Sequence, residues 1–442
     1  MTFEEARHLL ARTGFGATPD EIRRLSGMDR KAAVNHLVSQ AQAHRSAITS
    51  PPSWVHQLPP AHAHGERSQE EKKAFREARR AEGLELKQWW YRELLTTPSP
   101  LAERMTLFWH NHFTSSLHKV KWPAFLYRQN VLLRTYALGS FRDVLHGTAT
   151  DAAMIRYLDT QANHKDRPNE NYARELFELF TLGEGHYTEQ DIKQAARAFT
   201  GWQVDPRSGT VRMHHKQHDD GAKTVFGRTG NFSGKDILEL TLKRPEVAPF
   251  LVNKLWREFI SDTPDAREVT TLADSFRADG YRIAPLLERL FLTGAFWALE
   301  HRGVLIKSPV ELLVGTTHLI GSSQPDTIWM VHAGRRLGQD LFDPPNVKGW
   351  PGGTRWITSA TLLDRWQILQ RALRGHDMGG HQANQTMMQA DHTHGDDWTA
   401  REDAPTIQRT LLPIEPVHLR DANDTPWQIA KSCFMDPTYQ LK

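Results

Sequence analysis

The chain has 442 residues, of which 39% are hydrophobic and 24% are charged, a balance typical of a folded protein rather than a disordered one. Lysine and arginine number 55 against 52 acidic residues, so the net charge of +3 does not indicate a strongly basic nucleic-acid-binding domain. The single cysteine, Cys433, excludes an intrachain disulfide framework and a zinc site built on cysteines. No apolar run approaches the roughly 20 residues of a membrane-spanning helix. The first residues lack the apolar stretch of an export signal, so the sequence as written predicts a cytoplasmic protein.

Hydrophobic periodicity predicts helices over most of the chain. Apolar residues recur at helical spacing on both sides of a Gly/Pro break at 14–19, which predicts two helices within residues 3–40. A Pro- and His-rich loop and a highly charged helix at 66–84 follow. The predicted division is an N-terminal helical hairpin packed on the core (1–45), a Pro/His loop and charged helix (46–85), a main helical domain (86–375), and a mobile Gly/His-rich tail with a short C-terminal element near 426–434 (376–442).

The main domain interrupts its helices at two polar segments. Residues 203–235 lose the helical stripe, and turn residues between β-branched ones predict one short β-hairpin there. Residues 341–357 hold three prolines and three glycines and cannot be helical. The predicted helices are 86–96, 100–113, 123–138, 140–146, 151–158, 169–182, 188–200, 236–242, 246–261, 266–279, 282–299, 308–320 and 358–374. The predicted fold class is all-α, a large multi-helix single unit with Gly/Pro/His-rich polar loops.

The segment 169–183 carries the densest set of candidate catalytic groups. At 100° per residue, one stripe of this helix holds Glu170, Asn171, Arg174, Glu175, Glu178 and Thr181. The other residues are mostly apolar, so the helix should lie deep, where a polar stripe must be paired or line a cavity. We therefore assign catalytic roles to Glu175 and Glu178, as base or metal ligand, and to Arg174, as holder of an anionic group. The alternative is a solvated face with pairs such as Arg174–Glu178.

A His-Asn-His motif lies at the predicted end of the helix 100–113. His110 and His112 are about 200° apart on a helix, so both reach one ion only if the helix ends between them. Together with Glu170 they are the candidate ligands of a divalent metal ion, the one cofactor that the sequence suggests. The alternative is that one histidine caps the helix while the other packs among aromatic residues.

The polar loop 214–232 offers groups for proton transfer and anion binding. His218, oriented by Asp219, is a candidate for moving protons, and Lys223 with nearby backbone amides is a candidate for holding an anionic substrate group. The Gly-Lys-Ser/Thr order of a Walker loop is missing. Arg197, near the end of the preceding helix, is a further substrate-binding candidate that could pair with the carboxylate stripe.

The segment 343–356 is either a rigid packing corner or a ligand-binding wall. Asn346, Lys348 and Trp350 are its candidate substrate-binding residues. Trp350 and Trp356 could stack on a sugar or on an apolar ligand. The alternative is a turn held together by its aromatic residues.

Six motifs occur in the order ARTGFGATPDEI, LFWHNHFT, NENYARELFELFTLGEGHYTEQDI, ARAFTGW, HDDGAKTVFGRTGNFSG and PPNVKGWPGG. Over residues 3–370 they resemble the bacterial domain-of-unknown-function 1800 family. The resemblance implies a predominantly helical single unit and carries no established reaction. It also implies that relatives are often exported and encoded beside a sulfatase- or phosphatase-like partner family, which suggests envelope or polysaccharide work, although this sequence lacks an export signal.

Two functions from different classes fit these residues. The first is an enzyme, a hydrolase or transferase with or without a metal ion, acting on a polar substrate such as a carbohydrate or a phosphorylated compound. The second is a non-catalytic envelope or assembly protein whose buried polar networks fix the fold. A haem or redox protein is disfavoured by the lone cysteine and the missing Cys-x-x-Cys-His and Rossmann glycine patterns. If the polar groups converge around a cavity, the enzyme is favoured. If each polar group is instead hydrogen-bonded or ion-paired to another protein group and no cavity remains, the non-catalytic alternative is favoured.

Overall fold

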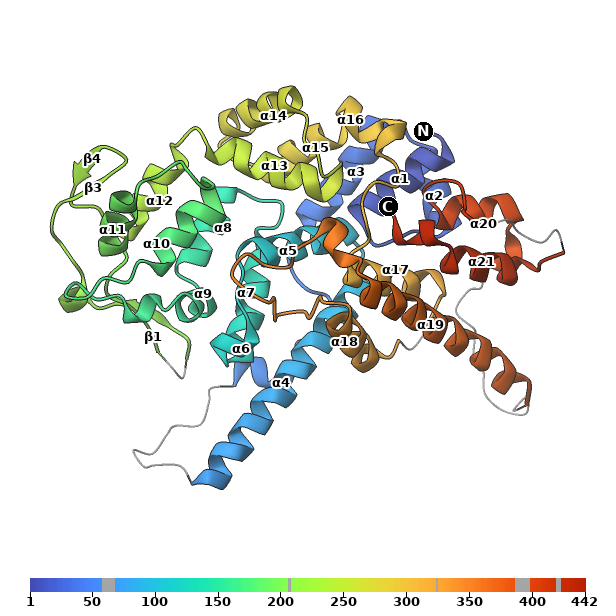
Figure 1. The fold of residues 1–442 in the computed structure, drawn as a ribbon, viewed down its shortest axis with the longest axis horizontal. Helices are drawn as coiled ribbons and strands as arrows, with labels where there is room; N and C mark the ends of the chain where they lie inside the picture. The colour runs from blue at the N-terminus through green and yellow to red at the C-terminus, as the bar shows by residue number, and fades with distance from the viewer. Residues whose placement is uncertain (58–67, 206–207, 323–324, 386–397, 419–422) are drawn as a thin grey trace.

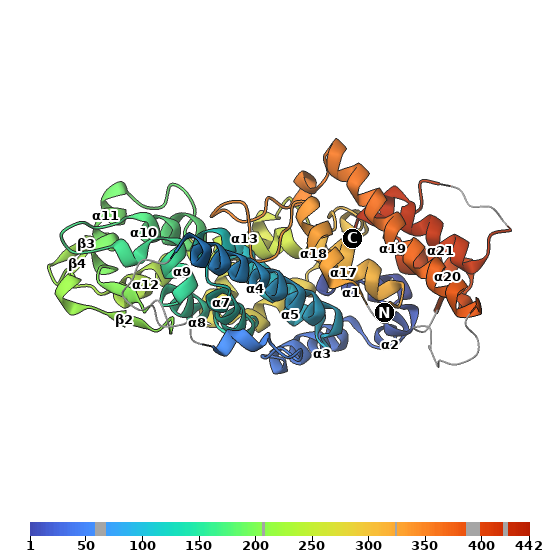
Figure 2. The same ribbon diagram turned by 90° about the horizontal axis from the view of Figure 1, so that it is seen from below.

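The computed structural model describes residues 1–57, 68–205, 208–322, 325–385, 398–418 and 423–442 (Figure 1). These residues form helices α1 to α21 and two small antiparallel hairpins, so the all-α fold class is confirmed. The molecule is elongated, with the hairpins at one end, α19 to α21 at the other, and α5 and α7 in the middle (Figure 2). Among the described helices, none combines the length and apolar character required to cross a lipid bilayer.

The N-terminal segment folds into three helices rather than the two predicted. They are α1 (Phe3–Thr13), α2 (Pro19–Ser26) and α3 (Arg30–Ala43). The extra break follows α2, where the side chain of Asp29 accepts a hydrogen bond from Ala32 N at 2.8 Å and so caps α3. The Gly/Pro break between α1 and α2 lies where the sequence predicted it.

The predicted charged helix and the predicted helix 86–96 are one continuous helix, α4 (Gln69–Thr96). Its charged N-terminal half projects away from the body of the molecule (Figure 1). Its C-terminal half carries Trp89 and Trp90 into the core, where both are fully buried. The charged run therefore has the solvated face expected of it, while the buried half provides most of the packing that stabilises the helix.

A buried ion pair connects α5 (Pro100–His112) with α7 (Pro123–Thr135). Glu103 accepts hydrogen bonds from Arg134 Nε and Nη2 at 2.5 and 3.0 Å, and from Trp90 Nε1 at 2.9 Å. Each of these groups is inaccessible to solvent, so each needs its partner, and the network fixes how α4, α5 and α7 lie against one another.

The predicted helix 169–182 is not regular. It begins as α10 (Asn171–Glu175) and continues as a π-helix, η3 (Leu176–Thr181). The N–H groups of Leu182 and Gly183 both donate to the carbonyl of Phe177, at 2.9 and 3.1 Å. The wider turn changes the angle between residues, so the prediction of one polar stripe through Thr181 was wrong. Thr181 is buried and its hydroxyl donates to the carbonyl of Leu176.

The segment 203–235 holds the predicted hairpin and a second one. The first pairs β1 (Trp202–Val204) with β2 (Val211–Met213), and the second pairs β3 (Lys223–Val225) with β4 (Arg228–Gly230). Strand β3 packs against α11 (Glu189–Ala198), which brings the polar loop between the hairpins next to the end of that helix.

The remaining helices follow the predicted order, except that α6, α18 and α20 were not predicted and that the predicted helix 282–299 is divided into α15 and α16. They are α6 (Leu117–Val120), α8 (Phe141–Ala149), α9 (Ala152–Tyr157), α12 (Gly234–Leu242), α13 (Val247–Phe259), α14 (Ala266–Ala278), α15 (Ile283–Phe291), α16 (Gly294–Trp297), α17 (Pro309–Leu319), α18 (Thr327–Arg336), α19 (Ser359–Gln385), α20 (Ala404–Leu411) and α21 (Pro426–Met435).

The C-terminal part differs most from its sequence-based description. Helix α19 continues past the predicted end at 374, and α21 is the short element predicted near 426–434. Helix α20 was not predicted and packs against α1, α2 and α21 with Ile407 and Leu411 buried. Residues 386–397 of the predicted mobile tail lie outside the described residues, and the division of the chain into domains stays a prediction.

Candidate functional site

The structure brings two of the predicted motifs together. The segment 343–352 runs across α5 in Figure 1, toward the helix that carries Glu175 and Glu178. The Nζ of Lys348 lies 3.9 Å from Oε1 of Glu178 and 3.9 Å from Oε1 of Glu184. These pairs are loose and Lys348 is 65% exposed, so they contribute little to stability. The lysine is therefore available to an anionic group.

The two carboxyl groups, Glu175 and Glu178, have different surroundings. Glu178 accepts a hydrogen bond from the hydroxyl of Tyr187 at 3.2 Å and faces Lys348. Glu175 is half-buried, and no hydrogen bond to it occurs among the described residues. Burial, and secondarily the negative charge of Glu178, raise the pKa of Glu175, while Lys348 and Arg174 oppose the rise. Unequal carboxyl groups side by side are typical of acid–base catalysis.

Two tyrosines that the sequence analysis did not select complete this cluster. Tyr157, at the end of α9, has its pKa raised to about 12 by burial and then by the charges of Glu175 and Asp343. Burial and the adjacent Glu178 likewise raise the pKa of Tyr187 to about 12. Tyr157 lies in an apolar helical segment that gives no functional signal. We call this cluster the carboxylate site and define it as Tyr157, Glu175, Glu178, Tyr187 and Lys348.

His112 and Lys254 hold the π-helix in place through hydrogen bonds to its backbone carbonyl groups. His112 Nε2 lies 3.0 Å from the carbonyl oxygen of Phe180, and Lys254 Nζ donates to the carbonyl of Leu179 at 3.0 Å. Lys254 Nζ also lies 3.1 Å from His112 Nδ1. Burial holds the pKa of His112 well below its usual range, so the ring is neutral, with Nε2–H as donor and Nδ1 as acceptor. Both ring nitrogens are therefore occupied, and His112 positions the helix that carries Glu175 and Glu178.

Asn111, the central residue of the His-Asn-His motif, fixes the segment 343–352. Its Oδ1 accepts a hydrogen bond from Trp350 N at 2.7 Å. Gly349 packs directly on it at a φ of +81°, and a Cβ at this position would lie 2.2 Å from Asn111 Oδ1. A glycine is required here both for the backbone conformation and for the close approach.

His110 is enclosed by aromatic rings. The ring centroids of Trp90, Phe342 and Trp350 lie 5.3, 5.3 and 5.6 Å from that of His110. Burial lowers its pKa to about 3, and neither ring nitrogen has a hydrogen-bond partner among the described residues. The predicted alternative, a histidine packed among aromatic residues, describes its surroundings.

The three candidate metal ligands do not meet. His110 and His112 lie in the separate environments just described, and Glu170 pairs with Arg174 at 3.1 Å. Arg174 also makes two hydrogen bonds of 2.8 Å to Glu189, which raise its pKa and commit its guanidinium to these partners. In the part of the chain that the structure describes, no group of three or more histidine, cysteine, aspartate or glutamate side chains is arranged to hold a metal ion.

The polar loop 214–231 forms a separate network around Arg197. Asp219 accepts hydrogen bonds from Arg197 Nε and Nη2 at 2.6 and 3.0 Å, and these lower the pKa of Asp219. Lys223 Nζ donates to the carbonyl of Asp219 at 2.6 Å. His218 Nδ1 lies 2.9 Å from the carbonyl of Thr200, so that carbonyl, rather than Asp219 as predicted, orients the ring. The expected pairing of Arg197 with the carboxylate stripe is replaced by its pairing with Asp219.

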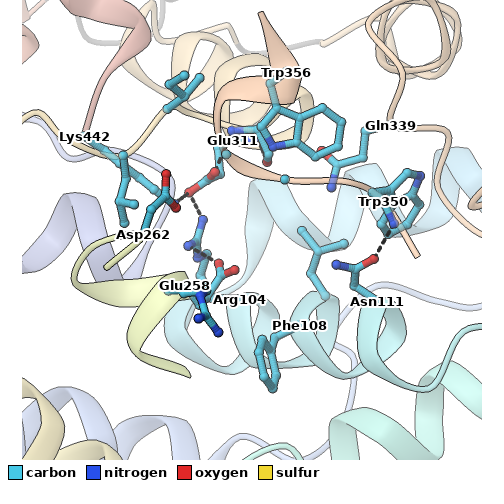
Figure 3. A pocket seen from close by; sticks show the side chains of 17 residues that line it. Arg104, Phe108, Asn111, Glu258, Asp262, Glu311, Gln339, Trp350, Trp356 and Lys442 are labelled. Atoms are coloured by element: carbon cyan, nitrogen blue, oxygen red, sulfur yellow. Dashed lines mark hydrogen bonds and ion pairs between the residues drawn. The ribbon is translucent and has the colours of Figure 1, made fainter. Parts of the chain in front are cut away.

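The remaining predicted residues lie on opposite sides of the segment 343–356, one side next to the carboxylate site and the other next to a cavity. Asn346 is exposed, and its Oδ1 accepts a hydrogen bond from Lys348 N at 2.9 Å, which shapes the turn beside the carboxylate site. Trp350 and Trp356 instead line a cavity on the other side of the segment (Figure 3). The segment therefore borders both the carboxylate site and this cavity.

Comparison with known proteins gives one match. No curated protein and no solved structure matches the chain. A family model does match, over residues 8–441. The match extends past residue 370, where the resemblance seen in the sequence ends, and includes α20 and α21. The chain therefore belongs to the family described as protein of unknown function (DUF1800), in agreement with the resemblance of its motifs.

Proposed function

We propose that the protein is an acid–base enzyme, a hydrolase or transferase acting on a polar substrate, with its catalytic groups in the carboxylate site. The observation that carries this proposal is the unequal pair Glu175 and Glu178. The first carboxyl is half-buried and has no hydrogen bond from any residue that the structure describes, whereas the second is hydrogen-bonded to Tyr187. Segments far apart in the sequence contribute Tyr157 and Lys348 to the same cluster.

The chemistry follows from these surroundings. Glu175, whose raised pKa favours the protonated form, would donate its proton to the leaving oxygen of the substrate. Glu178 would accept a proton from the attacking water or alcohol, so that one reaction leaves Glu175 ionised and Glu178 protonated, and proton exchange with solvent then restores both groups. Lys348 would bind a negatively charged substrate group, since it is exposed and only loosely paired.

The first test compares turnover of wild type with that of Glu175→Gln and Glu178→Gln on nitrophenyl glycosides, nitrophenyl phosphate and nitrophenyl acetate. Loss of general acid–base assistance lowers rates by about 10²–10⁴-fold. Glu184→Gln is the matched control, because Glu184 also lies 3.9 Å from Lys348 but its side chain is 78% exposed. Equal turnover of a substrate by wild type and both site variants would contradict the assignment.

A second test requires no substrate. Titration of ¹³C-labelled glutamate carboxyl groups by NMR should show Glu175 protonating above its ordinary value of 4.5. In Glu178→Gln its pKa should move down, because the neighbouring negative charge is removed. An ordinary pKa for Glu175 in both proteins would remove the basis of the proposal.

A second candidate function is the non-catalytic assembly role. The network of Arg197, Asp219 and Lys223 favours it, because there the polar groups are matched to one another. If this second function is correct, the protein hydrolyses none of the nitrophenyl substrates of the first test, and substitutions at Arg197, Asp219 or Lys223 change only its stability. The carboxylate site differs from that network because Glu175 has no hydrogen-bond partner in the described part of the chain.

A further inference from the structure

A small cavity lies where α1, α17 and α20 come together, toward the end of the molecule that carries α20 (Figure 1). The segment 14–17, which belongs to the first of the six quoted motifs, forms one wall, and Arg7, Lys307 and Lys442 line the cavity from separate parts of the chain. We propose that this cavity binds one chloride ion. It shares no residue with the carboxylate site, and the proposal does not rest on the proposed catalytic function.

Arg7 brings an unpaired guanidinium to the cavity. The residue lies on α1 and is only 7% exposed. Its Nε donates to the carbonyl of Thr410 at 3.4 Å, whereas its two Nη groups make no hydrogen bond or ion pair with any residue that the structure describes. Burial lowers the pKa of Arg7 to about 10, which leaves the group charged at neutral pH. A buried charge without a partner costs free energy, so these donors require an acceptor.

Lys307 is a second cation without a carboxylate partner. Its Nζ lies 3.5 Å from the centre of the Tyr439 ring, and no ion pair to it occurs in the described part of the chain. Burial, and then the charges of Arg7 and Arg365, lower the pKa of Lys307 well below its usual range. An anion in the cavity would raise this pKa and offset the repulsion between Arg7 and Lys307.

The one carboxylate among the described residues that line the cavity is already paired. Glu311 binds both Lys442 and Arg104. The described lining residues therefore place three cations, Arg7, Lys307 and Lys442, against this single carboxylate. The excess of positive charge favours an anion over a neutral or cationic ligand.

Backbone amides of the segment 14–17 add neutral donors. The N–H groups of Phe15, Gly16 and Ala17, residues that line the cavity, donate to no other residue among those described. Gly16 has a φ of +137°, a conformation that favours glycine. Successive free N–H groups in such a turn form a concavity suited to an anion. The segment thus supplements the two side-chain cations.

The size of the cavity limits the anion. Its volume is about 20 Å³ and it is partly open to solvent. A single water molecule needs about 10–15 Å³, so the space suits an ion of one atom and is too small for phosphate or sulfate. Chloride is the abundant anion of this kind in biological solutions, and it accepts hydrogen bonds from several N–H groups at once.

The test is the melting temperature of the full chain in chloride and in gluconate at equal ionic strength. Because the ion would bind the folded state alone, wild type should melt about 2–4 °C higher in chloride, with a saturable dependence on its concentration. Bromide should replace chloride, and crystals grown in bromide should show an anomalous peak within hydrogen-bond distance of Arg7 and Lys307. Equal melting in chloride and gluconate, or a cavity without bromide, would overturn the proposal.

Matched variants locate the ion. Lys307→Met removes one cation and keeps a side chain of similar length, so it should lose most of the chloride-dependent rise. In gluconate it should melt at or above wild type, because an uncompensated buried cation is removed. Arg7→Lys keeps a charge and should keep part of the rise. Arg24→Met is the control, because Arg24 is exposed on α2 and does not line the cavity.

An undiminished chloride-dependent rise in Lys307→Met would refute this location. If Lys307→Met or Arg7→Lys fails to melt cooperatively, the bromide position in wild type decides. Glu175→Gln should keep the full rise, because Glu175 does not line this cavity. Loss of the catalytic proposal would therefore leave the chloride site untouched, and loss of the chloride site would leave the catalytic proposal untouched.

Discussion

Replacement of Gly349 by alanine tests whether Asn111 fixes the segment that borders the carboxylate site and the cavity lined by Trp350. Gly349 has a φ of +81°, and a Cβ there would lie 2.2 Å from Asn111 Oδ1 and 2.6 Å from the Asn111 carbonyl oxygen. The left-handed conformation alone costs a non-glycine residue about 1–2 kcal/mol. To make room, the Asn111 side chain must also release Trp350 N, and an unsatisfied buried N–H costs about 1–3 kcal/mol. The expected sum is about 2–5 kcal/mol of local stability.

Gly185 provides the matched control. Its φ is +85°, and a Cβ there would meet no atom within 4 Å, so Gly185→Ala carries the conformational cost without the clash. The assay is amide hydrogen exchange at Trp350 together with thermal melting. A local loss of about 2 kcal/mol or more corresponds to at least a roughly 25-fold loss of protection for that amide. If Gly349→Ala lowers protection at Trp350 and the melting temperature no more than Gly185→Ala does, the contact with Asn111 does not fix this segment.

Four further outcomes follow from the site. Lys254 has its pKa lowered to about 7 by burial, so the folded state binds fewer protons and its stability should rise with pH between about 7 and 10.5; urea midpoints across this range should show a flatter rise in Lys254→Met. The raised pKa of Glu175 has the opposite effect and lowers the stability of the folded state as pH rises. Glu175→Gln should therefore stabilise the protein at pH 7 and lose that advantage below pH 4.5, and equal urea midpoints for the two proteins at pH 7 would contradict this prediction. Asp219→Ala removes the carboxylate partner of Arg197 and should expose the 214–231 loop to limited proteolysis, while the hydrogen-exchange protection of Trp350 N, which reports on α5, should stay unchanged. Dialysis against EDTA should leave melting and any turnover unchanged, because the candidate ligands His110, His112 and Glu170 each contact different neighbours, and a loss that zinc or magnesium restores would contradict this.

Periodicity predicted most helices because each buries one apolar stripe, and that requirement is local to the helix. It failed at Leu176–Thr181, where the extra residue per turn of the π-helix comes from hydrogen bonds to Phe177 that no local pattern reveals. It also missed α20, whose apolar face is short and is stabilised by packing on α1 and α2. These elements depend on tertiary contacts, which a reading of local propensity does not contain.

The candidate site shows the same division between local and tertiary information. The sequence analysis selected Glu175, Glu178, Lys348 and Trp350. Charged groups in apolar segments cost free energy to bury, and aromatic groups in Gly/Pro-rich segments need a packing surface, so such residues indicate a special role. Their grouping could not be derived, since Lys348 meets Glu178 only through the path of the segment 343–352 over α5. Residues whose role depends on a partner, such as Tyr157 beside Glu175, carried no signal of their own.

The His-Asn-His motif is better explained by position than by metal binding. Successive residues on a helix point about 100° apart, so three of them at a helix end can contact three different neighbours. Here His110 packs among aromatic rings, Asn111 holds Trp350 N, and His112 holds the carbonyl of Phe180. Through these contacts α5 sets both the segment 343–352 and the π-helix that carries the carboxylates. Asn111→Ala should therefore lower the hydrogen-exchange protection of Trp350 N and substrate turnover together.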